Sequence, residues 1–497
     1  MFGGLVAGRG SFRAGKAGAR LAQTEPAGGS GDAGTRMRSL GRDRSMCAWD
    51  DFTQSATAAR RSLAQARSGQ IPPFLMLSVP GMSAREHRRC SELWVRDRVA
   101  ASVPERTRLN FRFDLGVRDK LRVGYLSNDF HDHATAHLLI EALEATDRTR
   151  CELHAFSFGG NDHGAMRSRL SGAFEVFHDI TASTDSDAAS AVHAAAIDIL
   201  VDLKGFTRGA RTGIMMLHPA PVQVNFLGYP GTLGSGICDY IITDPFLTPL
   251  AAAADYAESF AYMPHSYQPH GRAALGRRPS RAEAGLPETG FVFCCFNQAY
   301  KFTPSVFDLW CRLLAATPDS VLWLLASDQA QGNLRGEALR RGVSPDRLVF
   351  APQIGQSEHL RRLQLADLVL DTAPYGAHTT ASDALWAGVP IVTCAGDTLA
   401  SRVAGSLLHA VGLPELIASD EADYVAVALT LAAEPDLLLA AKARLARNRL
   451  TAPLFDAAAY ARSLHDLYEQ MWNRRRRGAG REPIWAAAAP PGSPRPG

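Results

Sequence analysis

The residues most suited to chemistry lie in the last third of the chain, where Gly376-Ala-His-Thr-Thr380 joins an apolar run to a helical one. The run over 368–370 predicts a buried strand, and the pattern from Thr379 to a stop at Gly388-Val-Pro390 predicts a helix. A helix that begins after a glycine-containing turn exposes free backbone N–H groups, which suit a phosphate. The segment lacks a P-loop lysine and a G-x-G-x-x-G, so neither a P-loop NTPase nor a dinucleotide-binding dehydrogenase fits.

Basic side chains near two other predicted strands could support the same chemistry. Lys301 follows the apolar run 291–296, and an ammonium at the carboxyl end of a strand is placed to meet a phosphate. Taken alone, Lys301 is more often simply a surface lysine. His359 and Arg362 open a predicted helix, and a capped helix with a basic face also accounts for them.

Three histidines, His131, His133 and His137, follow the predicted strand 121–127. His133 and His137 have the spacing of a zinc-binding helix, but the glutamate of H-E-x-x-H is missing and no third ligand is evident. We therefore expect no metal here. A histidine at the carboxyl end of a first strand could instead be a general base or a hydrogen-bond donor to phosphate.

Asp185-Ser-Asp187 has the D-x-D pattern with which one class of sugar transferases holds a metal. It precedes a helical stretch, so capping of a helix start is the better interpretation.

Composition narrows the function classes. Basic residues concentrate in 1–46 and 474–497, which leaves a mildly acidic middle with no electrostatic case for nucleic acid. No apolar run reaches the length of a membrane span. The eight cysteines are widely spaced apart from the pair Cys294-Cys295, and no C-x-x-C occurs, which indicates a reducing compartment; we therefore expect a cytoplasmic protein with no membrane partner.

The pattern along the chain predicts an α/β protein with two doubly wound, Rossmann-like domains facing a cleft. Short apolar strands alternate with helices in two series, separated by an irregular stretch rich in Ala, Pro and Arg. The expected units are a disordered leader (1–46), a helical segment (47–110), an N-terminal catalytic domain (111–275), a C-terminal nucleotide-sugar-binding domain (285–456), a closing helix (457–473) and a disordered basic tail (474–497).

Ten motifs that occur in one order identify a family resemblance. They are Leu121-Arg-Val-Gly-Tyr-Leu-Ser-Asn-Asp-Phe with His133, Pro219-Ala-Pro-Val-Gln, Leu227-Gly-Tyr-Pro-Gly-Thr, Asp239-Tyr-Ile-Ile-Thr-Asp, Tyr262-Met-Pro-His, Phe296-Asn-Gln-x-Tyr-Lys301, Val321-Leu-Trp-Leu-Leu, Gly376-x-His-Thr-Thr380, Ala384-Leu-Trp-Ala-Gly and Thr398-Leu-Ala-Ser-Arg-Val. From about residue 50 to 473 the chain resembles the catalytic region of the O-linked N-acetylglucosamine transferases, the SPINDLY-like proteins of glycosyltransferase family 41.

The resemblance implies a GT-B fold and inverting, metal-independent transfer of N-acetylglucosamine from UDP-N-acetylglucosamine to Ser/Thr hydroxyls of proteins, without a cofactor. It assigns catalysis to His133, over the reacting centre, and to Lys301, on the donor diphosphate. The other nucleotide-sugar contacts that it implies are Gln298 on the diphosphate, His378, Thr379 and Thr380 on phosphate, Asp383 on ribose, and His359 with Arg362 beside uracil.

Two departures from the family pattern keep alternatives open. The family often has an acid three positions before the residue matching Asp198, where this chain has Ala195, which leaves His133 the stronger candidate for a base. No 34-residue tetratricopeptide repeat occurs in the sequence. The alternatives are the same fold with another donor, such as GDP-fucose or UDP-glucose, and a weakly active or non-catalytic nucleotide-sugar-binding scaffold.

Overall fold

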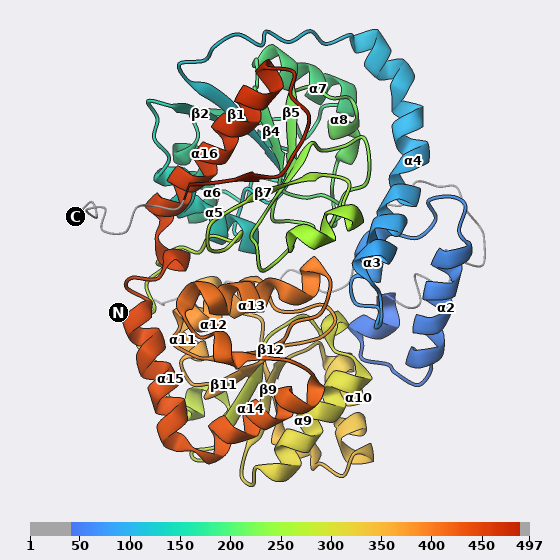
Figure 1. Ribbon diagram of the computed structural model, residues 1–497. Coiled ribbons are helices and arrows are strands. Elements are labelled where there is room, and N and C mark those ends of the chain that lie inside the picture. The colour runs from blue at the N-terminus through green and yellow to red at the C-terminus, as the bar shows by residue number, and fades with distance from the viewer. Residues whose placement is uncertain (1–40, 488–497) are drawn as a thin grey trace, which may run out of the picture.

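Two parallel sheets covered by helices form most of the chain in the computed structural model, which describes residues 41–487 (Figure 1). The first has the order β14-β7-β6-β5-β4-β1-β2-β3, and every pair in it is parallel. Its strands are β1 (Leu121–Ser127), β2 (Cys151–Ser157), β3 (Val176–Asp179), β4 (Ile199–Asp202), β5 (Val222–Asn225), β6 (Tyr240–Thr243), β7 (Ser259–Tyr262) and β14 (Ile484–Trp485).

The second sheet has the order β10-β9-β8-β11-β12-β13 and is also parallel throughout. Its strands are β8 (Val292–Cys295), β9 (Val321–Leu325), β10 (Leu348–Ala351), β11 (Leu368–Leu370), β12 (Ile391–Cys394) and β13 (Ile417–Ala418). Central strands such as β4, β8 and β11 are buried along their whole length, as expected for strands with helices on both faces. The predicted pair of doubly wound sheets is confirmed.

Each sheet has one point where the strand order reverses direction. In the first sheet β1 lies between β2 and β4, and in the second β8 lies between β9 and β11. Loops that leave the carboxyl ends of such neighbouring strands diverge to opposite faces, and ligands bind in the crevice between them. A ligand site is therefore expected at the residues that follow β1, β4, β8 and β11.

Helices cover both faces of each sheet (Figure 1). Those of the first sheet are α5 (Ala134–Glu144), α6 (Ala165–Ala173), α7 (Asp185–Ala194) and α8 (Thr212–Met216). Those of the second are α9 (Pro304–Ala316), α10 (Asp328–Arg340), α11 (Gln356–Leu363), α12 (Thr379–Trp386), α13 (Leu399–Val411), α14 (Glu421–Ala433) and α15 (Pro435–Asn448). Among residues 41–487 no single helix has the length and hydropathy of a membrane span, although α14 and α15, bent by 98°, pass that test as a pair.

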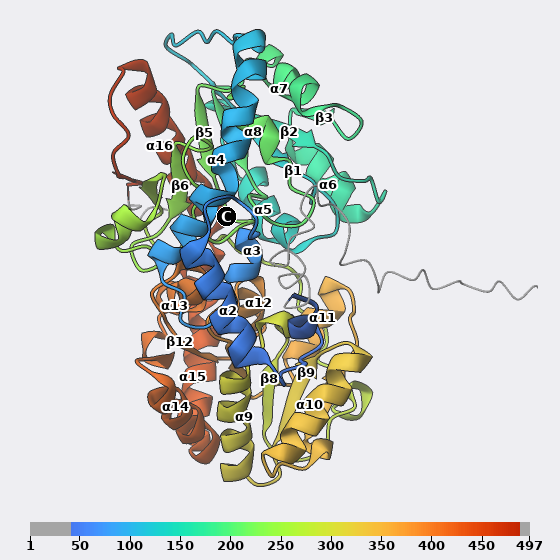
Figure 2. The same cartoon turned by 90° about the vertical axis from the view of Figure 1, so that its right-hand side faces the viewer.

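The expected helical segment consists of α2 (Phe52–Gln65), α3 (Pro73–Met76) and α4 (Ala84–Leu109), and it lies beside both sheets (Figure 2). A capping box between Ser83 and Glu86 fixes the start of α4. Residues 41–45 are helical too, and Arg44 Nη1 donates to Ser78 Oγ (3.0 Å). The expected leader to residue 46 therefore gives way to ordered chain from 41, and residues 1–40 lie outside the described part.

The carboxyl edges of the two sheets face each other. Asp244 directly follows β6, and its Oδ2 accepts hydrogen bonds from Ser406 Oγ on α13 (2.6 Å) and from the backbone N–H of Tyr267 (2.9 Å). Gln268, after β7, donates to Ser382 Oγ on α12 (2.9 Å). A continuous cluster of buried apolar side chains also runs through both units. These contacts hold the two carboxyl edges at a fixed separation.

The C-terminal part of the chain returns to the first sheet. Helix α16 (Ala457–Arg476) lies across that sheet, and β14 then pairs with β7 as an edge strand (Figure 1). We expected the helix to end at 473 and a disordered tail from 474, so residues 474–487 differ from that expectation. The order has a physical cause, because Ile484 is buried and the Trp485 ring stacks on Tyr262 with centroids 5.2 Å apart. Residues 488–497 lie outside the described part.

Replacing Ile484 with alanine should lower the free energy of unfolding by about 2 kcal/mol, the low end for a buried isoleucine because the strand is at an edge. Arg481→Ala is the control, since it removes only an exposed ion pair with Asp239 and should cost less than about 1 kcal/mol. Urea unfolding measures both. Equal stability of Ile484→Ala and the wild type would mean that β14 does not pair in solution.

Candidate active site

A buried ammonium group lies at the reversal point of the second sheet. Lys301 ends a short 3₁₀ turn, Ala299–Lys301, just after β8, and its side chain reaches the turn that follows β11. Its Nζ donates to the carbonyl of Gly376 (2.7 Å) and lies 3.8 Å from the centre of the Tyr375 ring. Burial lowers the pKa of Lys301 to about 8. The nearby Asp371 carboxylate raises this pKa, but within residues 41–487 no carboxylate lies within ion-pair distance of Nζ, so the charge of the ammonium is only partly balanced.

Asp371 organises the turn that meets Lys301. Its Oδ1 accepts hydrogen bonds from the backbone N–H of Thr372 (2.7 Å) and of Ala377 (2.6 Å), and its Oδ2 accepts from Thr393 Oγ1 (2.7 Å). Burial raises the pKa of this carboxyl group. The aspartate thus folds 371–377 into a tight turn that sets both the Gly376 carbonyl and the start of α12.

The N-terminus of α12 is open to a ligand. The backbone N–H groups of Thr379 and Thr380 donate no hydrogen bond within the described residues, which is the usual state of a helix start that can receive an anion. Thr380 Oγ1 donates to Asn297 Oδ1, which ties this end to the residue after β8. The structure thus brings Lys301 and the predicted threonines to one place.

His378, the residue before α12, has a fixed orientation. Its Nε2 hydrogen-bonds to the carbonyl of Ala400 (3.2 Å), so Nε2 carries the proton and Nδ1 presents a lone pair. Burial lowers its pKa to about 3, which keeps the ring neutral. His378 is therefore positioned to offer phosphate its backbone rather than a charged ring.

Asp383 lies one turn further along α12 and is buried. Its Oδ1 accepts from Gln356 Nε2 on α11 (2.9 Å) and from His270 Nε2, after β7 (3.2 Å). Its Oδ2 has no hydrogen bond within the described residues and remains available to a ligand hydroxyl. Gln356 and His270 were not predicted from the sequence, because only the folded chain brings these distant positions to α12.

His359 and Arg362 form a pair on α11 over an aromatic ring. Arg362 Nη2 donates to His359 Nδ1 (3.0 Å), and its guanidinium lies 4.5 Å from the centre of the Phe296 ring. Burial, opposed by Asp383 and assisted by Arg362, lowers the pKa of His359 to about 4. The neutral ring then carries its proton on Nε2, where it can donate to a carbonyl of a planar base. Gln298, by contrast, is exposed just before the turn that holds Lys301.

A second cluster lies at the reversal point of the first sheet. His133 precedes α5 as its N-cap, and the backbone N–H of Thr135 donates to its Nδ1 (3.2 Å). The same Nδ1 is 3.5 Å from Asp129 Oδ2, which accepts a hydrogen bond from Lys204 Nζ (2.7 Å). The buried Asp129–Lys204 pair was not predicted, although both residues follow strand ends, β1 and β4.

The position of Ala195 bears on the acid that the family often has there. Ala195 ends α7 and precedes β4, so it lies at the amino edge of the sheet, opposite His133. Asp198 is at that edge too, where Arg118 Nε donates to its Oδ1 (3.0 Å). The missing acid therefore leaves the carboxyl edge unchanged.

The D-x-D segment lies at the start of α7. Thr184 caps that helix, and Asp185 pairs with Arg211, which agrees with the capping interpretation. Among residues 41–487 no three His, Cys, Asp or Glu side chains cluster as metal ligands.

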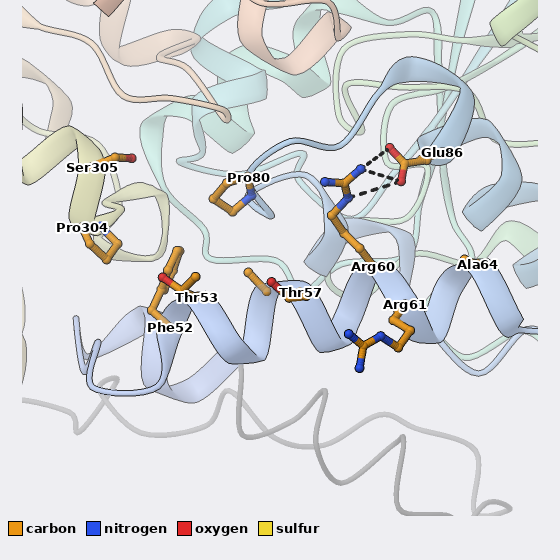
Figure 3. Close-up of a pocket in the computed structure, with 11 residues that line it drawn as sticks. Phe52, Thr53, Thr57, Arg60, Arg61, Ala64, Pro80, Glu86, Pro304 and Ser305 are labelled. Carbon is orange, nitrogen blue, oxygen red and sulfur yellow. Dashed lines mark hydrogen bonds and ion pairs between the residues drawn. The ribbon is translucent and has the colours of Figure 1, made fainter.

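A cavity of about 510 Å³ lies between α2 and the start of α9, away from the carboxyl edges of both sheets (Figure 3). Arg60 and Arg61 line it, and Arg60 is paired with Glu86 (3.1 Å). A smaller hollow lies at the second sheet and is lined by Phe296, Asn297 and Thr380 among others. Only this smaller hollow adjoins the residues that the sequence predicts.

Taken together, the second sheet offers a buried ammonium group, free N–H groups at a helix start, a carboxylate oxygen and a pair of basic side chains beside an aromatic ring. Such a set matches a diphosphate joined to a ribose and a planar base. The first sheet places a partly exposed imidazole on the facing edge.

Comparison with known proteins places the chain in a single family. A family model described as glycosyl transferase family 41 matches residues 81–272 and 277–464. The probable UDP-N-acetylglucosamine–peptide N-acetylglucosaminyltransferase SEC of Arabidopsis thaliana is 34% identical over 453 residues, covering 86% of this chain and 46% of the relative. The UDP-N-acetylglucosamine–peptide N-acetylglucosaminyltransferase of Caenorhabditis elegans is 32% identical over 478 residues, covering 73% and 42%. The chain thus spans less than half the length of these relatives.

A solved structure shares the fold. A mutant of the O-GlcNAc transferase of Thermobaculum terrenum superposes with a TM-score of 0.69 at 23% identity, and the match covers 90% of this chain and 99% of that one. This likeness confirms the predicted GT-B architecture.

The affinity for a nucleoside diphosphate should fall as pH rises above about 8. Lys301 is charged below its pKa of about 8 and neutral above it, so the loss of affinity should approach tenfold per pH unit. Calorimetric titration with UDP from pH 7 to 9 measures this. Lys301→Arg is the control, because a guanidinium stays charged throughout this range. A flat affinity in the wild type would contradict the assignment of Lys301 to the diphosphate.

Proposed function

Because the chain belongs to glycosyl transferase family 41, we propose that it transfers N-acetylglucosamine from UDP-N-acetylglucosamine to Ser or Thr hydroxyls of proteins. The names of its relatives support this donor and a peptide acceptor. The relatives are more than twice as long as the part of them that this chain matches. The proposal is therefore argued from the residues that the structure describes, 41–487.

The observation that carries the proposal is the incomplete charge balance of Lys301. Its ammonium has a carbonyl and an aromatic face as neighbours, and free N–H groups of α12 lie across the same turn. Because its direct contacts are neutral and Asp371 balances its charge only in part, this buried cation gains from an anionic ligand. In the proposal, the diphosphate of a nucleotide sugar supplies that anion, Asp383 binds the ribose and the His359–Arg362 pair binds the base.

In the proposed reaction the acceptor oxygen forms a bond to C1 of the sugar as the bond from C1 to the diphosphate oxygen breaks. The electron pair of the breaking bond stays on the diphosphate, which gains negative charge. Lys301 and the N–H groups of α12 stabilise that charge more in the transition state than in the ground state. Attack from the face opposite the leaving group inverts the configuration at C1. The sequence left two roles open for His133, a base or a hydrogen-bond donor.

Intact-mass analysis of candidate acceptor proteins co-expressed with the chain tests the proposal. The mass increment should equal one N-acetylhexosamine. An increment of a hexose or a deoxyhexose would show that the alternative with UDP-glucose or GDP-fucose is right. No increment on any acceptor, together with tight UDP binding, would favour the non-catalytic scaffold.

Lys301→Met should lower kcat/KM by roughly 10²–10³-fold, the loss expected for one donor that stabilises a developing anion. Lys120→Met is a matched control, since Lys120 directly precedes β1 at the amino edge of the first sheet and should leave the rate unchanged. Radiolabelled sugar transfer measures both variants. Equal rates for Lys301→Met and the wild type would remove the lysine from the mechanism.

The proposed reaction needs no metal, because Lys301 and the helix start provide the positive charge. Activity should therefore be unchanged after dialysis against EDTA, measured by the same transfer assay. Loss of activity that Mg²⁺ or Mn²⁺ restores would contradict this and would make Asp185 and Asp187 candidate metal ligands.

A further inference from the structure

The ring of His133 is held by the backbone that follows it. His133 is the N-cap of α5, and the N–H of Thr135 donates to its Nδ1 (3.2 Å). A nitrogen that accepts a hydrogen bond carries a lone pair, so the proton of the neutral ring is on Nε2. Nε2 makes no hydrogen bond within residues 41–487, and the side chain is 40% exposed. The ring therefore presents an N–H group, and not a lone pair, beyond the strand end.

The ion pair beside the ring favours the same tautomer. Asp129 Oδ2 is 3.5 Å from Nδ1, too far for a good hydrogen bond, and it accepts from Lys204 Nζ at 2.7 Å. Both side chains of the pair are less than a tenth exposed. Lys204 thus neutralises the carboxylate that, among residues 41–487, lies within 4 Å of Nδ1. The backbone N–H of Lys204 in turn donates to Asp202 Oδ1 (2.8 Å), which fixes the loop that carries the lysine.

We propose that His133 acts as a neutral hydrogen-bond donor, whose Nε2–H binds an oxygen of the transferred sugar or of the attacking hydroxyl. Asp129 and Lys204 are positioning residues that hold the ring in this tautomer. The inference rests on the proposed transfer reaction and gives His133 a role in it other than the general base that Ala195 led us to favour. A neutral imidazole capping a helix N-terminus is a known means of polarising a substrate oxygen.

This role changes where the acceptor proton goes. A ring that carries its proton on Nε2 has no lone pair there to accept another, and protonation of Nδ1 would break its hydrogen bond with Thr135 and place an imidazolium at the positive end of a helix. The proton of the attacking hydroxyl instead passes to an oxygen of the departing diphosphate, which gains a negative charge as its bond to C1 breaks. Atoms and charge balance without a basic side chain.

The charged and titratable groups around the ring support a neutral state. Asp129 raises the pKa of His133, whereas burial, the largest effect, lowers it, as do Lys204, His131 and His137. The net direction is downward. His137 is itself paired with Asp132 (2.6 Å). The ring is therefore uncharged at neutral pH.

Two-bond ¹H–¹⁵N correlation spectra of the full chain with labelled histidine test the tautomer directly, and His133→Ala assigns the signal. The expected spectrum shows a protonated Nε2 and an unprotonated Nδ1 at pH 7. Lys204→Met should raise the pKa of His133 by about one unit, because Asp129 loses its counter-charge. The double variant Asp129→Asn/Lys204→Met should restore the wild-type value and also controls for misfolding. Protonated Nδ1 in the wild type would overturn the proposal.

Ligand titrations in the same spectra test the contact. Three titrations distinguish a contact with the sugar oxygen from a contact with the hydroxyl oxygen of the acceptor. They use UDP alone, UDP-N-acetylglucosamine alone, and each of these ligands together with a Ser-containing acceptor peptide. A shift of the Nε2 signal that needs the sugar assigns the contact to the sugar, and one that needs the peptide assigns it to the hydroxyl. No shift in any arm would contradict the contact, and because no turnover is required, this result is independent of whether the transfer reaction itself occurs.

Kinetics of two variants separate a donor from a base. Glutamine retains an N–H donor near the position of Nε2 but cannot accept a proton. His133→Gln should therefore stay within about tenfold of the wild type, while His133→Ala should lose roughly 10²-fold, as for a lost transition-state hydrogen bond. A base would make both variants equally poor, by about 10²–10⁴-fold, and that outcome would overturn the donor role.

Discussion

The buried ammonium of Lys301 is the feature on which the rest of the site depends. A lysine that is 7% exposed must be solvated by the protein, and here a carbonyl of Gly376 and the ring of Tyr375 do so. That carbonyl is available because Asp371 folds the turn after β11, and the turn meets the lysine because β11 pairs with β8. The order of the strands thus positions the turn, and the turn positions the cation. The cation in this unit has no ion-pair partner among residues 41–487.

The first sheet uses the same topology with different chemistry. Its reversal point brings the loops after β1 and β4 together, and there the buried charges Asp129 and Lys204 satisfy each other. Contacts such as Asp244 to Ser406 hold the two carboxyl edges opposite one another. One edge therefore holds a buried cation that has no ion-pair partner among residues 41–487, while the facing edge has a balanced ion pair and presents a neutral imidazole. This asymmetry suits a reaction in which negative charge grows on only one side.

The sequence predicted the architecture, and it picked out residues that lie together at the second sheet, for local reasons. Apolar strands, helix starts and the lysine after β8 are encoded by neighbouring residues, so they were found without the fold. Asp129 and Lys204 are 75 positions apart, and only the strand order places β4 beside β1. His270 lies in the loop after β7 of the first sheet, whereas Asp383 lies on α12 beside the second. The ordered segment after α16 was missed because a short strand at an edge has no periodicity to detect.

A crystal structure of the chain with UDP bound tests the central claim most directly. The account predicts that the diphosphate lies between Lys301 Nζ and the backbone N–H groups of Thr379 and Thr380. Lys301 Nζ then donates to the diphosphate in place of the Gly376 carbonyl. A diphosphate bound elsewhere on the chain, with the contact from Lys301 to Gly376 unchanged, would contradict it.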